Sequence, residues 1–354
     1  MSNFLKKIHG FERKALRRHR MNEANRKFPS NKLVPLDELE KKLIREKWGK
    51  LSKYGLVNND YYKVFAFYKY FRNPLEIDLS PSDFYLMCEL ILNIQWSLNV
   101  LSHKSNLHFF IPEKNRPQNI VYGIHEHIYN ANDSAITKNE AFDLIKKHEQ
   151  FVVKQSIFTG GGKGVKRFEN ACDEHIRDIL KSSDFIVQEI LVQHDFFAEL
   201  NPSSVNTIRM ETLYLNDTSS VLSAFVRIGA KGCFVDNITG REGMVVGVDE
   251  QGRLSPFGLT SNYDKVYESS SGKKFEGLVI PNYQNIKETI MDFHKRFPLV
   301  NLINWDIALD ENGIVKIIEI NLNAMNPLYH QIFNGPLFKD RTDEVVDWVI
   351  RHSK

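Results

Sequence analysis

The sequence predicts an α+β fold, in which a helical N-terminal part precedes a run of strands. From about residue 150 the pattern changes from helical spacing to short runs rich in β-branched and aromatic residues. The order of strand, glycine-rich turn, helix, strand and then several consecutive strands favours an α+β layer over a doubly wound sheet. A chain of 354 residues with 42% hydrophobic content can bury a large core, which we expect to be divided over two or three subdomains.

Composition and charge exclude several classes of protein. The net charge of +3 is too small for this length to indicate nucleic-acid binding. The three cysteines, Cys88, Cys172 and Cys233, are widely spaced and form neither a disulfide framework nor a metal site, which fits a reducing cytoplasm. The most membrane-like stretch, 83–101, is interrupted by polar residues and is expected to be a buried soluble segment.

The N-terminal segment is strongly basic but has no apolar run or cleavage site typical of a secretory signal. Phe4, Ile8, Phe11 and Ala15 recur at helical spacing opposite the Lys and Arg residues. We expect a surface helix whose apolar stripe packs on the protein. The alternative is peripheral contact of residues 1–27 with an anionic membrane, at its inner face.

The elements before the strands are predicted from local signals. The aromatic-rich stretch 61–71 is expected in the core rather than as a stacking platform. Ser80 as N-cap and Pro81 as the first helical residue would open a long helix ending near Leu101. After it, the pattern predicts one helix at 166–180 and strands at 151–157, 184–190, 205–215, 221–228 and 243–248.

The first candidate site is a strand carrying Lys154 that leads into a glycine-rich loop, residues 159–164. Glycines let backbone N–H groups approach phosphate oxygens, and a lysine on a rigid strand adds a positive charge beside them. The spacing matches neither the P-loop nor the dinucleotide-binding pattern. The alternative is a flexible hairpin loop without a ligand.

The second candidate site is the predicted hairpin 302–321, with Asn312-Gly313 as its turn. This register places Asp306 opposite Glu319, and Asn304 opposite Asn321. One face of the hairpin then goes to the core, with Trp305, Ile307, Leu309, Ile314, Ile318 and Ile320. The other face carries Asp306, Glu319 and Asn321, with Ala308, Val315 and Ile317 nearer the turn.

Two carboxylates that face each other repel unless a cation lies between them. Mg²⁺ prefers such hard oxygen ligands together with water and substrate phosphates. The hairpin therefore indicates a magnesium site formed by Asp306, Glu319 and Asn321. The alternative is an amphipathic hairpin whose acids are simply solvated.

Together the two sites resemble the ATP-grasp superfamily, and more narrowly its group associated with sugar transfer and surface-polysaccharide synthesis, from about residue 85 to 335. The segments that carry the resemblance are Leu101 to Leu107, Phe151 to Val165, Val187 to Ile190, Ser203 to Arg209, Val235 to Asn237, Asn304 to Asp306 and Ile318 to Asn321. It implies two α+β subdomains that clamp ATP: a lid at 151–195 and a metal-binding subdomain at 196–354. Residues 1–80 would form a basic helical region, and 81–150 a helical and linker part before the grasp.

The resemblance also implies roles for single residues. Its nucleotide-binding set is Lys104, Lys154, Thr159, Gly160, Gly161, Gly162, Gly164, Gln188, Glu189, Ile190, Asn206, Asp236 and Asn237. Within this set the two lysines would contact the phosphates, the loop 159–164 would be the lid, and the 189–190 hinge would meet the adenine. Arg209, Lys154 and Arg227 would be catalytic, and Asp306, Glu319 and Asn321 would hold Mg²⁺.

Each role has an alternative that the residues leave open. Lys104 also fits a cation at a helix C-terminus, Arg209 a structural ion pair, and Asp236-Asn237 a turn. Two positions depart from the group's pattern: His103 stands where Asp is expected, and Arg241-Glu242 separates two expected adjacent glycines. Both departures concern the acceptor side of the site more than the nucleotide side.

The activity that the resemblance implies is an ATP-dependent carboxylate–amine ligase that forms an amide through an acyl phosphate. The expected substrates are a sugar acid or amino acid and an amine, in cell-surface polysaccharide biosynthesis. Two alternatives remain: a kinase that phosphorylates a hydroxyl, and a nucleotide-binding module without turnover.

Overall fold

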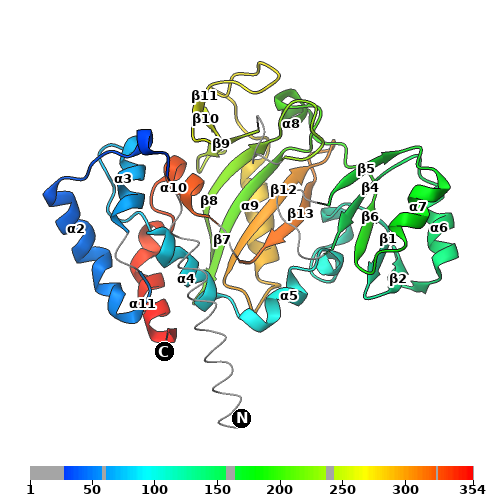
Figure 1. Ribbon diagram of the computed structural model, residues 1–354, viewed down its shortest axis with the longest axis horizontal. Helices are drawn as coiled ribbons and strands as arrows, with labels where there is room; N and C mark the ends of the chain where they lie inside the picture. The colour runs from blue at the N-terminus through cyan, green and yellow to red at the C-terminus, as the bar shows by residue number, and fades with distance from the viewer. Residues whose placement is uncertain (1–27, 58–60, 157–163, 237–242, 324–325, 354) are drawn as a thin grey trace, which may run out of the picture.

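The computed structural model describes residues 28–57, 61–156, 164–236, 243–323 and 326–353. Within them the chain forms a helical region, a large antiparallel sheet and a small antiparallel sheet, side by side along the long axis (Figure 1). The predicted α+β class is confirmed, because helices accompany two sheets in which the described strand pairings are antiparallel. The basic segment 1–27, expected as a surface helix or a membrane contact, lies outside the described residues.

The helical region brings the two ends of the described chain together. It combines α2 (Glu38–Trp48), α3 (Tyr62–Phe71) and α4 (Ser82–Leu92) with α10 (Leu328–Asn334) and α11 (Thr342–His352). These helices, blue, cyan and red in Figure 1, surround one hydrophobic core. Phe65, Phe67 and Tyr68 of α3 are fully buried, so the aromatic-rich stretch belongs to the core, as predicted.

Helix α4 is buried on nearly every side, because its sequence is apolar all round. It has 11 residues, and no helix in the described ranges is long and apolar enough to cross a membrane. Its predicted start is one position too early, since Pro81 is the N-cap rather than the first helical residue. Ser80, the predicted N-cap, instead donates its backbone N–H to the side chain of Gln331.

The helix expected to run to Leu101 ends at Leu92, because Asn93 adopts an extended conformation and leaves it. The Asn93 amide donates to the carbonyls of Leu302 and Leu322, at 2.9 and 2.8 Å. Its Oδ1 accepts from the backbone of Asn301 and Leu302. This one side chain ties the chain after α4 to the edge of the large sheet. The short helix α5 (Leu98–Leu101) follows as a separate element.

The small sheet has the strand order β3-β2-β1-β6-β4-β5. Its strands are β1 (Asn119–Ile124), β2 (His127–Asn130), β3 (Ala135–Ile136), β4 (Gln150–Gln155), β5 (Lys166–Glu169) and β6 (Phe185–Gln188). The helices α6 (Lys138–Lys146) and α7 (Asp173–Ile179) share its hydrophobic core. The sheet begins at residue 119, where β1 pairs with β6, whereas the lid subdomain is predicted to begin at residue 151.

The helix predicted at 166–180 is also corrected. Residues 166–169 form β5, which pairs with β4 from Gln150 to Val153, so only the second half of the segment is helical. Asn170 has a φ of +51° and separates the strand from the helix that follows. The strands predicted at 151–157 and 184–190 are confirmed as β4 and β6.

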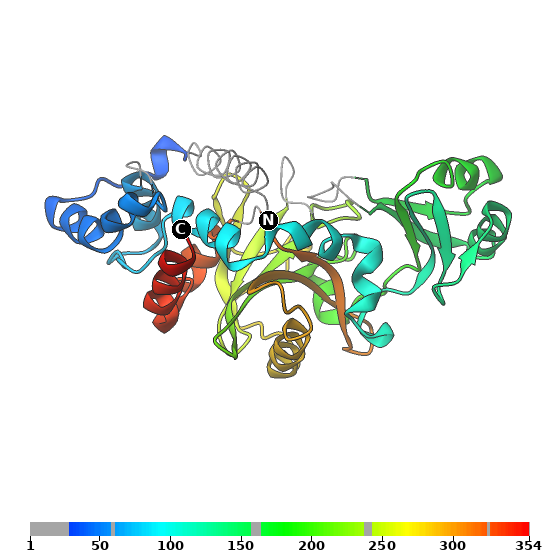
Figure 2. The same ribbon diagram turned by 90° about the horizontal axis from the view of Figure 1, so that it is seen from below.

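The large sheet has the strand order β11-β10-β9-β8-β7-β12-β13. Its strands are β7 (Thr207–Leu215), β8 (Thr218–Ile228), β9 (Met244–Val248), β10 (Leu254–Thr260), β11 (Lys265–Val266), β12 (Leu302–Leu309) and β13 (Val315–Asn321). Figure 2 shows α9 (Tyr283–His294) on one face and the cyan helices α4 and α5 on the other. Trp305 is fully buried in the core that α9 helps to form, as predicted.

The β12–β13 hairpin has the predicted register at its far end and a different one near its turn. Asp306 pairs with Glu319 and Asn304 with Asn321, as expected. Toward the turn the register shifts by one residue, so Ile317 rather than Ile318 pairs with Ile307. Ile317 and Val315, predicted on the face of the acids, are therefore in the core with the α9 side chains.

The register shift has its cause in Asp310. The Asp310 Oδ1 accepts from the backbone N–H groups of Asn312 and Ile314, at 3.0 and 2.8 Å. This closes a turn of three residues between Asp310 and Ile314, with Gly313 at a φ of +76°. The extra turn residue is compensated by a bulge at Ile318, which restores the pairing of the acids.

Candidate active site

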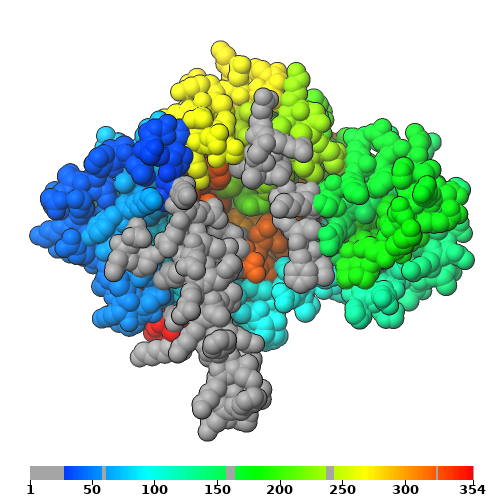
Figure 3. Space-filling view, viewed as in Figure 1, coloured from blue at the N-terminus to red at the C-terminus, as the bar shows by residue number. Residues whose placement is uncertain are grey.

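A cleft lies between the small sheet and the large sheet. Side chains from β4 and β6 line one wall, and side chains from β7, β8, β12 and β13 line the other. Its charged and polar lining residues are Lys104, Lys154, Gln188, Glu189, Thr207, Arg209, Arg227, Asp236, Asp306, Glu319 and Asn321. In the space-filling view, orange atoms of the C-terminal part lie in the hollow beside the green small-sheet part (Figure 3).

Two lysines from separate elements enter this cleft. Lys104 begins a short 3-10 helix, Lys104–Phe109, and its backbone N–H donates to the carbonyl of Ser156, at the end of β4. Its Nζ lies 2.9 Å from Oε1 of Glu319. Lys154 is on β4, where burial lowers the pKa of its amine to about 8, although Glu319 opposes that shift. The predicted convergence of both lysines on one cleft is found.

Arg209 and Asp306 form a close ion pair on the large-sheet wall of the cleft. They are direct partners on β7 and β12. Nε and one terminal nitrogen of Arg209 donate to the two oxygens of Asp306, each at 2.6 Å. This two-point geometry is the one that guanidinium and carboxylate groups prefer. Burial alone would raise the pKa of the Asp306 carboxyl, but Arg209 and Arg227 outweigh it and lower that pKa.

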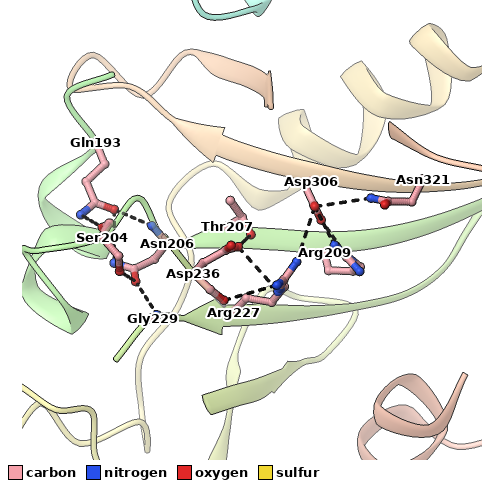
Figure 4. Close-up of polar contacts among 10 residues, drawn as sticks. All are labelled: Gln193, Ser204, Asn206, Thr207, Arg209, Arg227, Gly229, Asp236, Asp306 and Asn321. Carbon is pink, nitrogen blue, oxygen red and sulfur yellow. Dashed lines mark hydrogen bonds and ion pairs between the residues drawn. The ribbon is translucent and has the colours of Figure 1, made fainter. Parts of the chain in front are cut away.

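Arg227 connects this pair to Asp236 (Figure 4). Its guanidinium lies 3.6 Å from Oδ2 of Asp306 and 3.6 Å from Oδ2 of Asp236. The hydroxyl of Thr207 donates to the same Asp236 oxygen. Arg227 stands opposite Thr207 in the β7–β8 ladder, so both side chains reach the cleft from one face of the sheet.

The three residues predicted to hold a metal all line the cleft. Asp306 and Glu319 face each other across the ladder, and the Asn321 amide donates to Oδ2 of Asp306 at 3.4 Å. In the described ranges there is no group of three or more His, Cys, Asp or Glu side chains that could hold a metal ion. The set here is instead two carboxylates and one amide, whose hard oxygen atoms suit Mg²⁺.

The end of β6 forms another wall of the cleft. Gln188 is buried and donates its side-chain N–H to Oδ1 of Asn119, at 2.9 Å. Its own Oε1 is buried and has no hydrogen-bond partner in the described part of the chain. Glu189 is exposed, and its backbone N–H donates to the carbonyl of Gln118. Ile190 lines a neighbouring hollow, whereas Leu191 lines the cleft itself.

One expected nucleotide contact is corrected. Asn206 is fully buried, and its amide donates to the carbonyls of Phe197 and Asn201, both at 2.8 Å. Its Oδ1 accepts from Ser204, so protein groups satisfy the side chain (Figure 4). Asn206 therefore holds the chain before β7 in shape instead of lining the cleft.

Several predicted residues lie outside the described part: Thr159, Gly160, Gly161, Gly162 and Asn237. Gly164 is described, with a φ of +76°, and the next residue, Val165, lines the cleft. Sequence reasoning missed Thr207, although its place two residues before Arg209 on a strand puts both on one face. It also missed the apolar lining, which includes Pro117, Val205 and Phe234 and has no local signal.

Comparison with known proteins gives a family match over more than half of the chain. A family model described as sugar-transfer associated ATP-grasp matches residues 120–347. No curated protein sequence matches the chain.

Similar solved structures include the biotin carboxylase domain of 2-oxoglutarate carboxylase from Hydrogenobacter thermophilus, in complex with MgADP, ADP and bicarbonate. It is 12% identical over 74% of this chain and 47% of that one, with a TM-score of 0.43. D-alanyl-alanine synthetase A from Vibrio cholerae is 13% identical over 71% and 64%, with a TM-score of 0.41. An L-amino acid ligase from Bacillus licheniformis is 12% identical over 90% and 62%, with a TM-score of 0.40. The chain thus spans about half to two thirds of the length of these proteins.

Proposed function

Because this chain belongs to the sugar-transfer associated ATP-grasp family, we propose that it is an ATP-dependent, ADP-forming ligase that joins a carboxylate to an amine. One observation carries the proposal: cations from both walls of the cleft converge on the acids of the β12–β13 hairpin. Lys104 and Lys154 come from the small-sheet side, and Arg209 and Arg227 from the large sheet. Positive charges gathered around a cleft favour the transfer of a phosphoryl group, because they stabilise the charge on its oxygen atoms.

The nucleotide would lie with its phosphates at the lysines and its base near the end of β6. Apolar residues such as Pro117 and Leu191 offer surfaces for a flat ring. The Gln188 Oε1 atom has no partner among the described residues and would accept a hydrogen bond from an exocyclic amino group, as adenine has. Asp306, Glu319 and Asn321 supply the oxygen atoms that would hold Mg²⁺, and a bound Mg²⁺ would neutralise charge on the phosphates.

The reaction would proceed in two steps. In the first, a carboxylate oxygen of the substrate attacks the γ-phosphorus, the bond from that phosphorus to the ADP oxygen breaks, and an acyl phosphate forms. In the second, the amine nitrogen attacks the acyl carbon, phosphate leaves with one former carboxylate oxygen, and the nitrogen loses a proton. Arg209 and Arg227 would orient the anionic oxygens during both steps, and the apolar lining would limit hydrolysis by water.

The family description, which associates the group with sugar transfer, supports a proposal for the substrate class. We propose a sugar acid or an amino acid as the carboxylate, and an amino acid or amino sugar as the amine, in the synthesis of a cell-surface polysaccharide. Carboxylates of this kind are small and anionic, which suits a cleft lined by Arg209 and Arg227.

The test measures ADP release by the full-length protein with ATP, Mg²⁺, a panel of sugar acids and amino acids, and a panel of amines. A ligase releases ADP only when both substrates are present. Carboxylate labelled with ¹⁸O should transfer one label to the released phosphate. ADP release with a hydroxyl acceptor alone, without transfer of label, would identify a kinase instead. Binding of ATP without turnover on any panel member would identify a nucleotide-binding module.

A further inference from the structure

Three of the four cations that line the cleft in the described part of the chain form ion pairs within the protein itself. Lys104 contacts Glu319, Arg209 contacts Asp306, and Arg227 contacts both Asp306 and Asp236. Three positive side chains therefore compensate three carboxylates. The two carboxylates that would hold Mg²⁺ are both among those occupied in this way.

The contacts on Asp306 are the strongest of the set. Its side chain is only 7% exposed and accepts two hydrogen bonds of 2.6 Å from Arg209. A buried carboxylate separated from such a partner loses far more than an exposed one does. A divalent cation that approaches without nucleotide must compete with a guanidinium already in contact with both oxygens of Asp306.

The phosphate chain of a bound nucleotide would change the competition between a metal ion and the cationic side chains for these carboxylates. Guanidinium and ammonium groups bind phosphate oxygens as well as they bind carboxylates, and a guanidinium does so with the same two-point geometry. Phosphates that attract Arg209 and Lys104 would leave Glu319 without its lysine partner and Asp306 with only the longer, 3.6 Å contact to Arg227. Those two oxygen donors would then be available to a metal.

We propose that the cleft binds metal and nucleotide as a coupled pair, because Arg209 and Lys104 hold the metal-binding carboxylates until phosphate oxygens take their place. This inference rests on the proposed function, since it takes the cleft to be a nucleotide site. By thermodynamic linkage the coupling is reciprocal: nucleotide strengthens metal binding by the factor by which metal strengthens nucleotide binding. The ion pairs of the free protein thus prevent a divalent metal from occupying the site alone.

The first arm of the test uses Mn²⁺ as a spectroscopic probe and needs no nucleotide. Mn²⁺ is titrated into the full-length protein, and the loss of the free-ion electron paramagnetic resonance signal gives its affinity. Arg209→Gln, which removes the two-point contact, should bind Mn²⁺ at least tenfold more tightly than the wild type. Arg253→Gln is the matched control, because Arg253 also contacts an aspartate, Asp249, at 2.8 Å, but on the exposed surface. It should leave Mn²⁺ affinity unchanged.

Equal Mn²⁺ affinity in the wild type and Arg209→Gln would overturn the inference. Circular dichroism and thermal melting establish whether the variant is folded. If it is not, Lys104→Gln gives the same test from the other side of the cleft, because it releases Glu319.

The second arm measures ADP affinity by calorimetry with and without Mg²⁺. The factor by which Mg²⁺ increases ADP affinity should be at least several-fold larger for the wild type than for Arg209→Gln. Binding of Mg²⁺ to free ADP in solution is the same for both proteins and cancels in this comparison. An equal increase in ADP affinity in both proteins on addition of Mg²⁺ would also contradict the coupling. If no ADP binds to the wild type, the proposed function fails, while the Mn²⁺ arm still decides whether the ion pairs exclude the metal.

Discussion

Lys104 and Glu319 are 215 positions apart in the sequence, yet the Lys104 amine donates to the Glu319 carboxylate at 2.9 Å. Lys104 precedes the small sheet and Glu319 belongs to the last strand of the large one. The contact therefore marks the place where the two walls of the cleft meet.

Replacement of Glu319 should separate activity from stability. Glu319→Ala removes one of the proposed metal ligands, so Mg²⁺-dependent ADP release should fall to background. Because the ion pair is partly exposed, the free energy of unfolding should change by only about 0.5 kcal/mol. ADP release and urea denaturation measure the two effects, with the exposed Glu276→Ala as control. Wild-type turnover in Glu319→Ala would exclude the metal assignment.

Lys154 should contribute to nucleotide affinity. Lys154→Met keeps most of the side-chain volume but removes the charge, and it should weaken ATP binding at least tenfold, or about 1.4 kcal/mol, in calorimetry. The exposed Lys166→Met, on the adjacent strand β5, should bind ATP as the wild type does. An unchanged affinity in Lys154→Met would move the nucleotide site elsewhere.

The pH dependence of binding should identify the same lysine. Burial lowers the pKa of Lys154 to about 8, so in the free protein its positive charge is lost as the pH rises through that value. Phosphate favours the charged form, and ADP affinity should therefore decrease between pH 7 and 9.5. Lys154→Arg stays charged over this range and should show a flatter profile. Parallel profiles for the two proteins would assign the decrease to another group.

Glu211 should make stability depend on pH. It is fully buried beside Tyr85, whose hydroxyl donates to it at 2.6 Å, and burial raises the pKa of its carboxyl to about 7. A carboxyl with a raised pKa in the folded state loses its stabilising contribution as the pH rises. The free energy of unfolding of Glu211→Gln, relative to that of the wild type, should therefore increase as the pH rises from 5 to 8, by on the order of 1 kcal/mol. Urea denaturation at both pH values measures the difference in unfolding free energy between the two proteins. The same difference at pH 5 and pH 8 would contradict the prediction.

Asn93 should be important for folding although it lies outside the cleft. It makes four hydrogen bonds, with three residues at the edges of β12 and β13, and its side chain is buried. Asn93→Ala leaves those backbone groups without partners and should cost about 3 kcal/mol of unfolding free energy. The exposed Asn99→Ala serves as control in the same denaturation experiment. A cost below about 1 kcal/mol would mean that water replaces the lost contacts.

The sequence predicts the strand pair at the centre of the cleft, whereas the start of the small sheet is not evident from it. Strand periodicity and one turn signal predict the pair of Asp306 with Glu319, and the structure keeps this pair because the bulge at Ile318 offsets the extra turn residue. The small sheet begins before the lid subdomain predicted at 151–195, since the pairing of β1 with β6 joins segments far apart in the chain. Pairings of that kind have no local signal.

Two other differences from the predictions come from single polar side chains whose hydrogen-bond partners are not evident from residue spacing. Asn93 ends α4 through contacts with residues 301, 302 and 322, which its immediate sequence does not reveal. Asn206 lies in a motif that resembles a ligand-binding segment, but its amide faces protein carbonyls. Residue spacing identifies which side chains share one face of a strand. Only the packed fold determines which of these polar groups contact other protein groups and which can contact a ligand.

The bulge at Ile318 has a consequence for how this cleft can diverge among related proteins. A regular ladder with a two-residue turn and the observed ladder with a three-residue turn both align Asp306 with Glu319. Between the acids and the turn, the two arrangements place opposite sets of side chains on the cleft face: a regular ladder would place Ile317 there, whereas Ile318 lines the cleft here. A substitution at Asp310 that favours the shorter turn would therefore exchange the apolar lining while the acids keep their partners. The lining of the cleft and the pairing of its acids are therefore set by separate features of one hairpin, the turn at Asp310 and the ladder at Asp306.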